Sequence, residues 1–237
     1  MRKTVGAAAL ILTALGGATA DHFLRPLPAP IYQTFLDSHQ LPSGNILREA
    51  KLSNGSIVQE PIPIDQYLRY KHQRKQTPPK DLSGYATPQD PTLQNLAQFL
   101  VKDSKTREEK AQLILDFVNT QLPYPYYEAR EGATHEAPKY PLEALVEGGN
   151  CSSKAILGAS LMHAVGLEVA LISYPEHVAI GVAGSFQGKD SRFYDFEGTR
   201  YYFAEAAGGP YQAGTRAPKI GEMPDKYFKN ADVFPLK

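Results

Sequence analysis

The feature that most constrains this chain is a lone cysteine at the start of a predicted helix. Residues 148–151 read Gly-Gly-Asn-Cys, so two glycines that permit a sharp turn and a favourable N-cap residue directly precede Cys151. Apolar residues then recur at spacings of three or four as far as Val165, and Gly166 suits the left-handed position just beyond a helix end. The pattern predicts a helix that begins at Cys151 and has one apolar face.

A helix start changes the chemistry of a thiol. Free backbone N–H groups and the positive end of the helix dipole stabilise an anion there, which can lower the pKa of a cysteine by one to several units from about 8.5. Because the thiolate is the nucleophilic form, Cys151 is a candidate catalytic residue. The alternative is that Cys151 is a small apolar residue of the core.

The N-terminus has the pattern of an export signal. Arg2 and Lys3 precede an apolar run over 5–17, and residues 18–20 read Ala-Thr-Ala, the small residues that signal peptidase recognises. We expect residues 1–20 to be a cleaved signal peptide and the mature protein to be secreted or periplasmic. An uncleaved membrane anchor is the alternative, although the run is short for a bilayer span, and we expect no stable membrane insertion after cleavage.

Export also bears on Cys151, the single cysteine among the 237 residues. Outside the cytosol most cysteines pair in disulfides, and a lone cysteine has no partner within its own chain. A reactive role for this thiol is therefore favoured over an inert one.

Residues 21–89 are predicted to form a proline-rich N-terminal extension. Asn54-Gly55 lies between two runs rich in apolar residues, which is a strong signal for a type I′ turn and a β-hairpin. Pro61 and Pro63 restrict the second strand to a sheet edge. The basic run over 70–75 is typical of a solvated linker, and a domain boundary is expected before residue 90.

Residues 90–237 are predicted to form one domain that begins with helices. Asp90 followed by proline marks one helix start, and Thr106 with Glu109 three residues later forms a capping box at another. A short helix is expected over 141–147, directly before the glycine turn. Beyond the cysteine helix the hydrophobic period changes to two, which predicts strands over 168–173, 177–183, 192–196 and 199–205. The last 30 residues contain glycine and proline and are expected to be mostly loop.

The strand predicted over 177–183 has two different faces. One face carries the branched apolar residues, among them Val178. His177 shares the opposite face with alanines and a glycine, and such small residues would let a helix approach closely. We therefore expect this face, with His177, to point toward the cysteine helix.

In chain order the sequence supplies a cysteine at a helix start, a histidine at a strand start and a carboxylate at a strand end. Thiol catalysis needs these three parts: Cys151 would attack, His177 would accept and return a proton, and Glu205 would hold the imidazole in one tautomer. Backbone N–H groups at the helix start would supply an oxyanion hole.

Residues 110–214 resemble the transglutaminase-like superfamily, which shares a papain-like core. The resemblance rests on five stretches, which are 141–145, 149–154, 166–171, 177–182 and 201–205. It implies an α+β fold in which the cysteine helix packs on an antiparallel sheet whose next strands carry the histidine and the acid. Two residues depart from the pattern, since Asn150 and Glu205 stand where Asp is usual, and Asp195 is the alternative third member.

Composition excludes several other classes of function. Lys plus Arg equal Asp plus Glu at 25 each, which gives no electrostatic reason to expect a nucleic-acid partner. The six histidines lack metal-ligand spacing, and the chain has no phosphate loop or dinucleotide fingerprint, so no metal or cofactor is expected.

Two functions remain. The first is an exported cysteine enzyme, a peptidase, amidase or transamidase that acts on a protein or peptide substrate. The second is a non-catalytic transglutaminase-like module that binds cell-envelope or other exported proteins, because fold alone does not determine activity.

Overall fold

The computed structural model describes residues 35–40 (backbone only), 44–52, 55–73, 75, 81–124, 137–175, 177–186, 191–207, 220–221 and 231–237. The predicted signal peptide lies outside these residues. So do Asn54 of the predicted hairpin turn and most of the last 30 residues.

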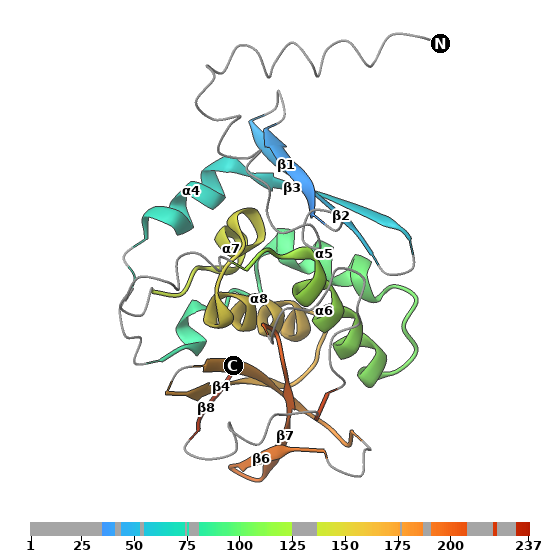
Figure 1. Cartoon of the computed structure of the whole chain (residues 1–237), viewed down its shortest axis with the longest axis vertical. Helices are drawn as coiled ribbons and strands as arrows, with labels where there is room; N and C mark the ends of the chain where they lie inside the picture. The colour runs from blue at the N-terminus through green and yellow to red at the C-terminus, as the bar shows by residue number, and fades with distance from the viewer. Residues whose placement is uncertain are drawn as a thin grey trace.

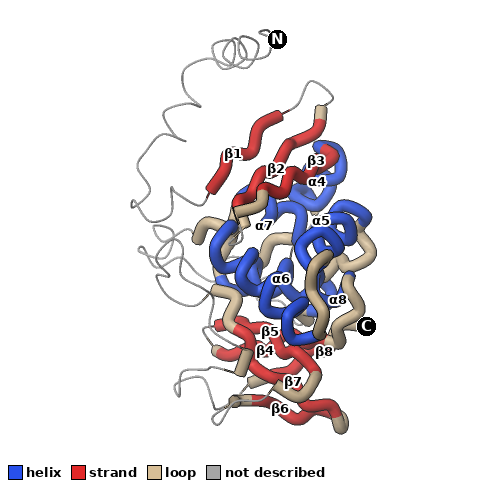
Figure 2. The backbone as a smooth tube through the Cα atoms, turned by 90° about the vertical axis from the view of Figure 1, so that its right-hand side faces the viewer, coloured by secondary structure: helices blue, strands red, loops and turns tan. Residues whose placement is uncertain are grey.

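The described elements form a helical layer between two sheets (Figures 1 and 2). The helices are α4 (Ile64–His72), α5 (Pro91–Val101), α6 (Arg107–Gln121), α7 (Pro141–Glu147) and α8 (Cys151–Ala164), with a short 3₁₀ helix at Ser83–Tyr85. Figure 2 shows strands β1–β3 on one side of this layer and β4–β8 on the other.

Both sheets are antiparallel. The smaller has the order β1-β2-β3, and the larger has the order β6-β7-β5-β4-β8. Their strands are β1 (Phe35–Gln40), β2 (Asn45–Lys51), β3 (Ile57–Pro63), β4 (Val169–Tyr174), β5 (His177–Ala183), β6 (Phe193–Phe196), β7 (Thr199–Ala204) and β8 (Asp232–Pro235). The predicted α+β class, with the cysteine helix against an antiparallel sheet, is confirmed.

Local signals fixed where the helices begin. The Asp90 side chain accepts a hydrogen bond from the backbone N–H of Thr92, with proline at the first helical position of α5. Thr106 and Glu109 form the predicted capping box of α6. The hairpin β2–β3 also forms, and its proline-bearing strand β3 lies at a sheet edge as predicted.

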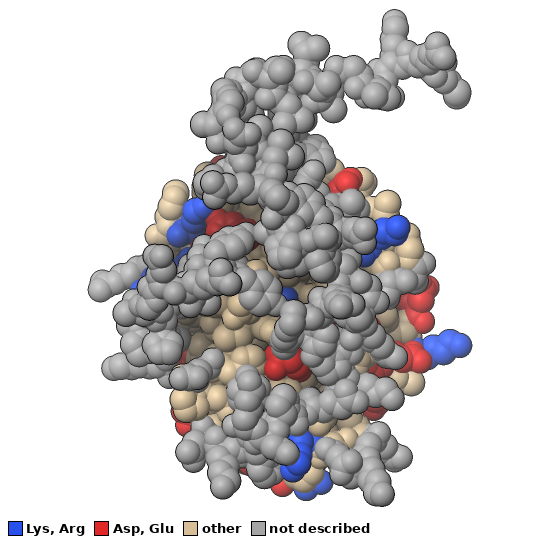
Figure 3. All heavy atoms as spheres, viewed as in Figure 1, with Lys and Arg blue, Asp and Glu red and all other residues tan. Residues whose placement is uncertain are grey.

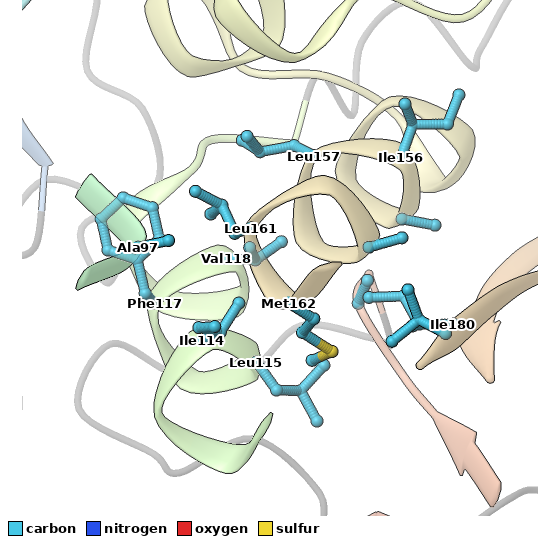
Figure 4. Close-up of a cluster of buried hydrophobic side chains, with 14 of the residues drawn as sticks. Ala97, Ile114, Leu115, Phe117, Val118, Ile156, Leu157, Leu161, Met162 and Ile180 are labelled. Carbon is cyan, nitrogen blue, oxygen red and sulfur yellow. The ribbon is translucent and has the colours of Figure 1, made fainter. Parts of the chain in front are cut away.

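Helix α8 is the centre of the core. Residues 153–162 are buried without exception, so the helix is covered on all sides rather than on the single apolar face that the sequence predicts. Figure 4 shows Leu115 and Val118 of α6 on one side of α8 and Ile180 of β5 on the other. The N-terminal end of α8, which carries Cys151, is thereby held in a fixed place between helices and sheet.

His177 reaches the start of the cysteine helix as predicted, but the prediction that the small residues of β5 face this helix is wrong. Ile180 and its branched neighbours Val178 and Val182 belong to the same buried cluster as α8. Close approach comes from the helix instead, since a Cβ on Gly158 would lie 2.6 Å from Ile180 Cδ1. The small residues of β5 make room for side chains of adjacent strands, because a Cβ on Gly181 would meet Tyr201 Cβ at 2.9 Å.

The expectation of a solvated linker over 70–75 is only partly met: residues 71–73 are exposed, but residues 70–72 belong to a helix. Residues 64–72 form α4, whose basic end contacts α7. Lys71 Nζ lies 2.6 Å from a Glu147 carboxylate oxygen, and Lys75 Nζ lies 2.6 Å from both carboxylate oxygens of Glu143. Strands β1 and β8 are further elements that the sequence analysis did not predict.

The surface carries both signs of charge. On the face shown in Figure 3, basic and acidic side chains lie interspersed among the described atoms, as the equal numbers of the two kinds in the sequence lead one to expect. Within the described part of the chain, no helix combines the length and the apolar character that a bilayer span requires.

Arg48 links the small sheet to the helices. It is 3% exposed, and its guanidinium donates hydrogen bonds to the carbonyls of Leu145 at 2.9 Å and Gln121 at 2.8 Å. Ala50 and Ile62 of the same sheet join the buried cluster of the helices. The division of the chain at residue 90 stays a prediction, and these contacts supply a test of it.

We predict that Arg48→Met lowers the free energy of unfolding by about 2–4 kcal/mol, because two buried carbonyls lose their donors. Urea unfolding of the full chain measures the change. Arg200→Met is the control, since Arg200 is exposed and its replacement should leave the urea midpoint nearly unchanged. Equal midpoints for the two variants would instead indicate an extension that contributes nothing to the stability of residues 90–237.

Candidate active site

Cys151 stands at the first position of α8, with its side chain partly exposed. Asn150 caps the helix as predicted: its Oδ1 accepts hydrogen bonds from the Ser153 backbone N–H at 3.1 Å and from the hydroxyls of Ser152 and Ser153 at 2.9 Å each. Ser153 Oγ in turn accepts a hydrogen bond from the backbone N–H of Lys139 at 3.0 Å. The turn that presents the thiol is thus tied to the segment before α7.

The two glycines before this turn are required by space as well as by backbone conformation. Gly148 has φ +73°, and a Cβ there would lie 2.5 Å from the carbonyl oxygen of Pro123. Gly149 donates its N–H to that same oxygen at 3.2 Å, and a Cβ on it would lie 2.5 Å from Ser153 Cβ. The chain therefore passes Pro123 at a distance that leaves no room for a side chain.

Strand pairing brings His177 and Glu205 together. His177 begins β5, Glu205 follows directly after β7, and the antiparallel register pairs Ile180 with Ala204. The start of one strand thus lies beside the end of the other. His177 Nε2 is 2.9 Å from Glu205 Oε2 and 3.1 Å from Oε1, and both residues are buried, at 9% and 4% exposed.

Two groups hold Glu205 in this position. The backbone N–H of Ala207 donates to Glu205 Oε1 at 2.8 Å. The side-chain amide of Asn119 on α6 donates to the backbone carbonyl of Glu205 at 2.7 Å and to that of Leu115 at 3.1 Å. The carboxylate is therefore fixed both directly and through its own backbone.

Cys151 and His177 are hydrogen-bonded, and each changes the other's pKa. Burial opposes ionisation of the thiol, but His177 and the backbone N–H groups of Val178 and Ser152 together hold the pKa of Cys151 below its ordinary value. Burial likewise disfavours the imidazolium, but Cys151 and Glu205 raise the pKa of His177 to about 10. Both directions favour a thiolate beside an imidazolium.

Tyr174 supports the imidazole from the neighbouring strand. It is the register partner of His177 across β4 and β5, and the two rings are stacked with centroids 6.2 Å apart and planes 24° apart. Tyr174 in turn contacts Phe203 and Tyr194 edge-on. The His177 ring is thereby restrained by an aromatic side chain as well as by Glu205.

The structure brings Cys151, His177 and Glu205 together and does not bring Asp195 to them. Asp195 lies on β6 with its side chain 58% exposed, and its carboxylate accepts hydrogen bonds from Arg200 at 3.0 and 3.3 Å. Asn119 and Tyr174 are further residues of the site that were not expected from the sequence. Strand pairing could have indicated Tyr174, whereas the sequence around Asn119 carries no signal for its contact with Glu205.

Comparison with known proteins adds little to this geometry. No protein-family model matches the chain, and no curated protein matches it. Among solved structures the chain has a distant similarity to a "putative protease" from Parabacteroides distasonis ATCC 8503, with a TM-score of 0.29 and 13% sequence identity. The match covers 75% of this chain and 41% of that one, so this chain spans well under half of that protein.

We predict that Gly148→Ala slows alkylation of Cys151 and lowers the free energy of unfolding, because the new Cβ must displace Pro123 or the turn before the thiol. Gly166→Ala is the matched control: Gly166 has φ +78°, but a Cβ there would meet nothing within 4 Å. It should cost about 1–2 kcal/mol of stability from its backbone conformation and leave the alkylation rate unchanged. Iodoacetamide kinetics and urea unfolding measure the two effects, and equal alkylation rates in the two variants would contradict the prediction.

Proposed function

We propose that this protein is an exported, transglutaminase-like cysteine enzyme that acts on peptide or amide bonds as a hydrolase or a transamidase. The observation that carries the proposal is the hydrogen-bonded arrangement of the partly exposed Cys151 with the buried His177 and Glu205. These three residues supply the nucleophile, the base and the orienting carboxylate that nucleophilic thiol catalysis requires.

In the first half of the reaction the Cys151 thiolate attacks the carbonyl carbon of the substrate. Backbone N–H groups at the start of α8 would stabilise the oxyanion that forms. When the C–N bond breaks, His177 gives its proton to the leaving amine and a thioester remains on Cys151. Since His177 Nε2 contacts Glu205, Nδ1 is the ring nitrogen left to exchange this proton.

In the second half, water or an amine attacks the thioester and gives its proton to His177. The C–S bond then breaks, which restores the thiolate beside the imidazolium and releases an acid or a new amide. Hydrolysis and transamidation differ only in this acceptor. Glu205 stabilises the imidazolium and fixes the ring orientation in both halves.

A protein or peptide substrate outside the cytosol fits this chemistry. The support for export is the predicted signal peptide over residues 1–20 and the single cysteine, which no disulfide within the chain can consume. On this proposal the mature enzyme carries its reactive thiol into an oxidising compartment. Partial burial of Cys151 limits the contact of the thiol with oxidants there.

A non-catalytic binding module is the second candidate. The observation that favours it is the pair of departures from the superfamily pattern, Asn150 before the cysteine and Glu205 in place of Asp. Asn150 serves here as the helix cap, and Glu205 reaches His177 despite its extra methylene. The state of the thiol therefore distinguishes the two candidates.

We predict that Cys151 in the full chain titrates with an apparent pKa below about 7.5, so that iodoacetamide alkylation reaches its plateau well below pH 8.5. His177→Ala should raise this pKa by about one unit or more, because the thiolate loses its positive partner while burial still opposes ionisation. Since the chain has one cysteine, all alkylation reports on this site. A thiol that titrates near 8.5 and is unaffected by His177→Ala would favour the binding module.

We predict that Cys151→Ser abolishes acyl transfer, because a hydroxyl is hardly ionised near neutral pH.

Glu205→Gln should leave Cys151 open to alkylation but lower turnover on the order of a hundredfold or more, because the imidazolium loses its carboxylate. Mass spectrometry of a peptide library, with hydroxylamine as a competing acceptor, measures turnover and traps the acyl group. Asp195→Asn is the matched control and should change neither quantity. Equal turnover in the Glu205 and Asp195 variants would show that Glu205 has no role in the reaction.

A further inference from the structure

Lys154 is a buried basic residue that the proposed reaction does not use. It lies on α8 one turn after Cys151 and is only 3% exposed. An ammonium group in such a place is costly unless polar partners replace the water it has lost. The position of these partners shows what the side chain does.

The partners of Lys154 lie at the C-terminal end of α6. Its Nζ donates a hydrogen bond to the carbonyl of Leu122 at 3.2 Å and a longer one to the carbonyl of Asn119 at 3.5 Å. Leu122 is the C-cap residue of α6, so these carbonyls belong to the last turn, where acceptors lack partners within the helix and the helix dipole is negative. Lys154 therefore binds the end of α6 from inside the protein.

The same contact closes a ring of interactions around the candidate active site. Asn119 accepts from Lys154 through its backbone and donates through its side chain to the backbone carbonyl of Glu205 at 2.7 Å. Glu205 contacts His177 at 2.9 Å, and His177 is hydrogen-bonded to Cys151. We call this set the Lys154 ring; its members are Lys154, Asn119, Glu205, His177 and Cys151.

Electrostatics within the ring agree with this arrangement. Burial lowers the pKa of Lys154 to about 8, while the negative charge of Glu205 opposes that shift. The ammonium form therefore predominates at neutral pH, and its charge is attracted by the carboxylate that faces His177.

We propose that Lys154 is a positioning residue for the thiol site: by binding the end of α6 it fixes Asn119, and through it Glu205, relative to the cysteine-bearing end of α8. This inference rests on the proposed function. Lys154 touches neither the substrate nor the reacting atoms. Its effect reaches Cys151 through Asn119, Glu205 and His177, so loss of Lys154 loosens the carboxylate and weakens the pairing of imidazole and thiol.

Ser160 offers a control on the same helix. It is fully buried, its hydroxyl donates to the Ile156 carbonyl at 2.8 Å, and it accepts from the backbone N–H of Thr87 at 3.2 Å. Like Lys154, it ties α8 to another segment through a buried polar group. Unlike Lys154, it lies farther along the helix and outside the Lys154 ring, so its removal tests the effect of destabilising α8 alone.

The experiment compares the pH dependence of iodoacetamide alkylation in the full chain, wild type, Lys154→Met and Ser160→Ala. We expect Lys154→Met to raise the apparent pKa of Cys151 by about half a unit or more. Ser160→Ala should leave it unchanged, although it lowers the urea midpoint. An unchanged thiol pKa in folded Lys154→Met, with a depressed one in the wild type, would overturn the positioning role and leave the proposed function standing.

Asn119→Ala breaks the same ring at the next link without changing any charge. It keeps the inference testable if Lys154→Met does not fold, and it separates positioning from the loss of a nearby positive charge. We expect the same direction of shift in the thiol pKa. An unchanged thiol pKa in this variant would overturn the positioning role of the Lys154 ring. An ordinary thiol pKa near 8.5 in the wild type would overturn both this role and the proposed function.

Discussion

The structure depends on the complete burial of a helix whose first residue is a thiol. Because residues 153–162 of α8 have no solvent face, other elements must cover it all round, and α5, α6, α7, β4 and β5 do so. Such a helix cannot shift or rotate without opening the core, since interiors are packed to crystal-like density. The N-terminal turn of α8 is therefore a rigid platform, and the strand ends that carry His177 and Glu205 meet it at a fixed position.

Burial alone would favour the neutral forms of Cys151 and His177, and pairing reverses this. Burial opposes the thiolate and the imidazolium separately, yet the contact between the two residues lowers the pKa of Cys151 and, together with Glu205, raises that of His177. A solvent-exposed carboxylate could not raise the pKa of the imidazole in the same way. Asp195 illustrates this: more than half of its side chain is exposed, and it has its own partner in Arg200, where solvent screens the interaction.

Signals confined to a few residues predicted much of the fold, and pairings across the chain account for what the sequence missed. Asp90, Thr106 and Asn150 cap the helices that they were expected to begin, because capping needs only neighbouring residues. The face of β5 that meets α8 was mispredicted, because the close contact comes from Gly158 on the helix and not from the small residues of the strand. Asn119 reaches Glu205 over 86 positions, a contact for which no local pattern exists.

The groups that stabilise the fold near the site are also those that orient it. Asn119 satisfies a backbone carbonyl and holds Glu205, and Asn150 caps α8 and shapes the turn of Cys151. Tyr174 packs against Phe203 and restrains His177. Selection for a stable core would preserve these contacts even in a protein without activity. The ionisation of the thiol, which adds nothing to the packing, is therefore the property that distinguishes an enzyme from a binding module.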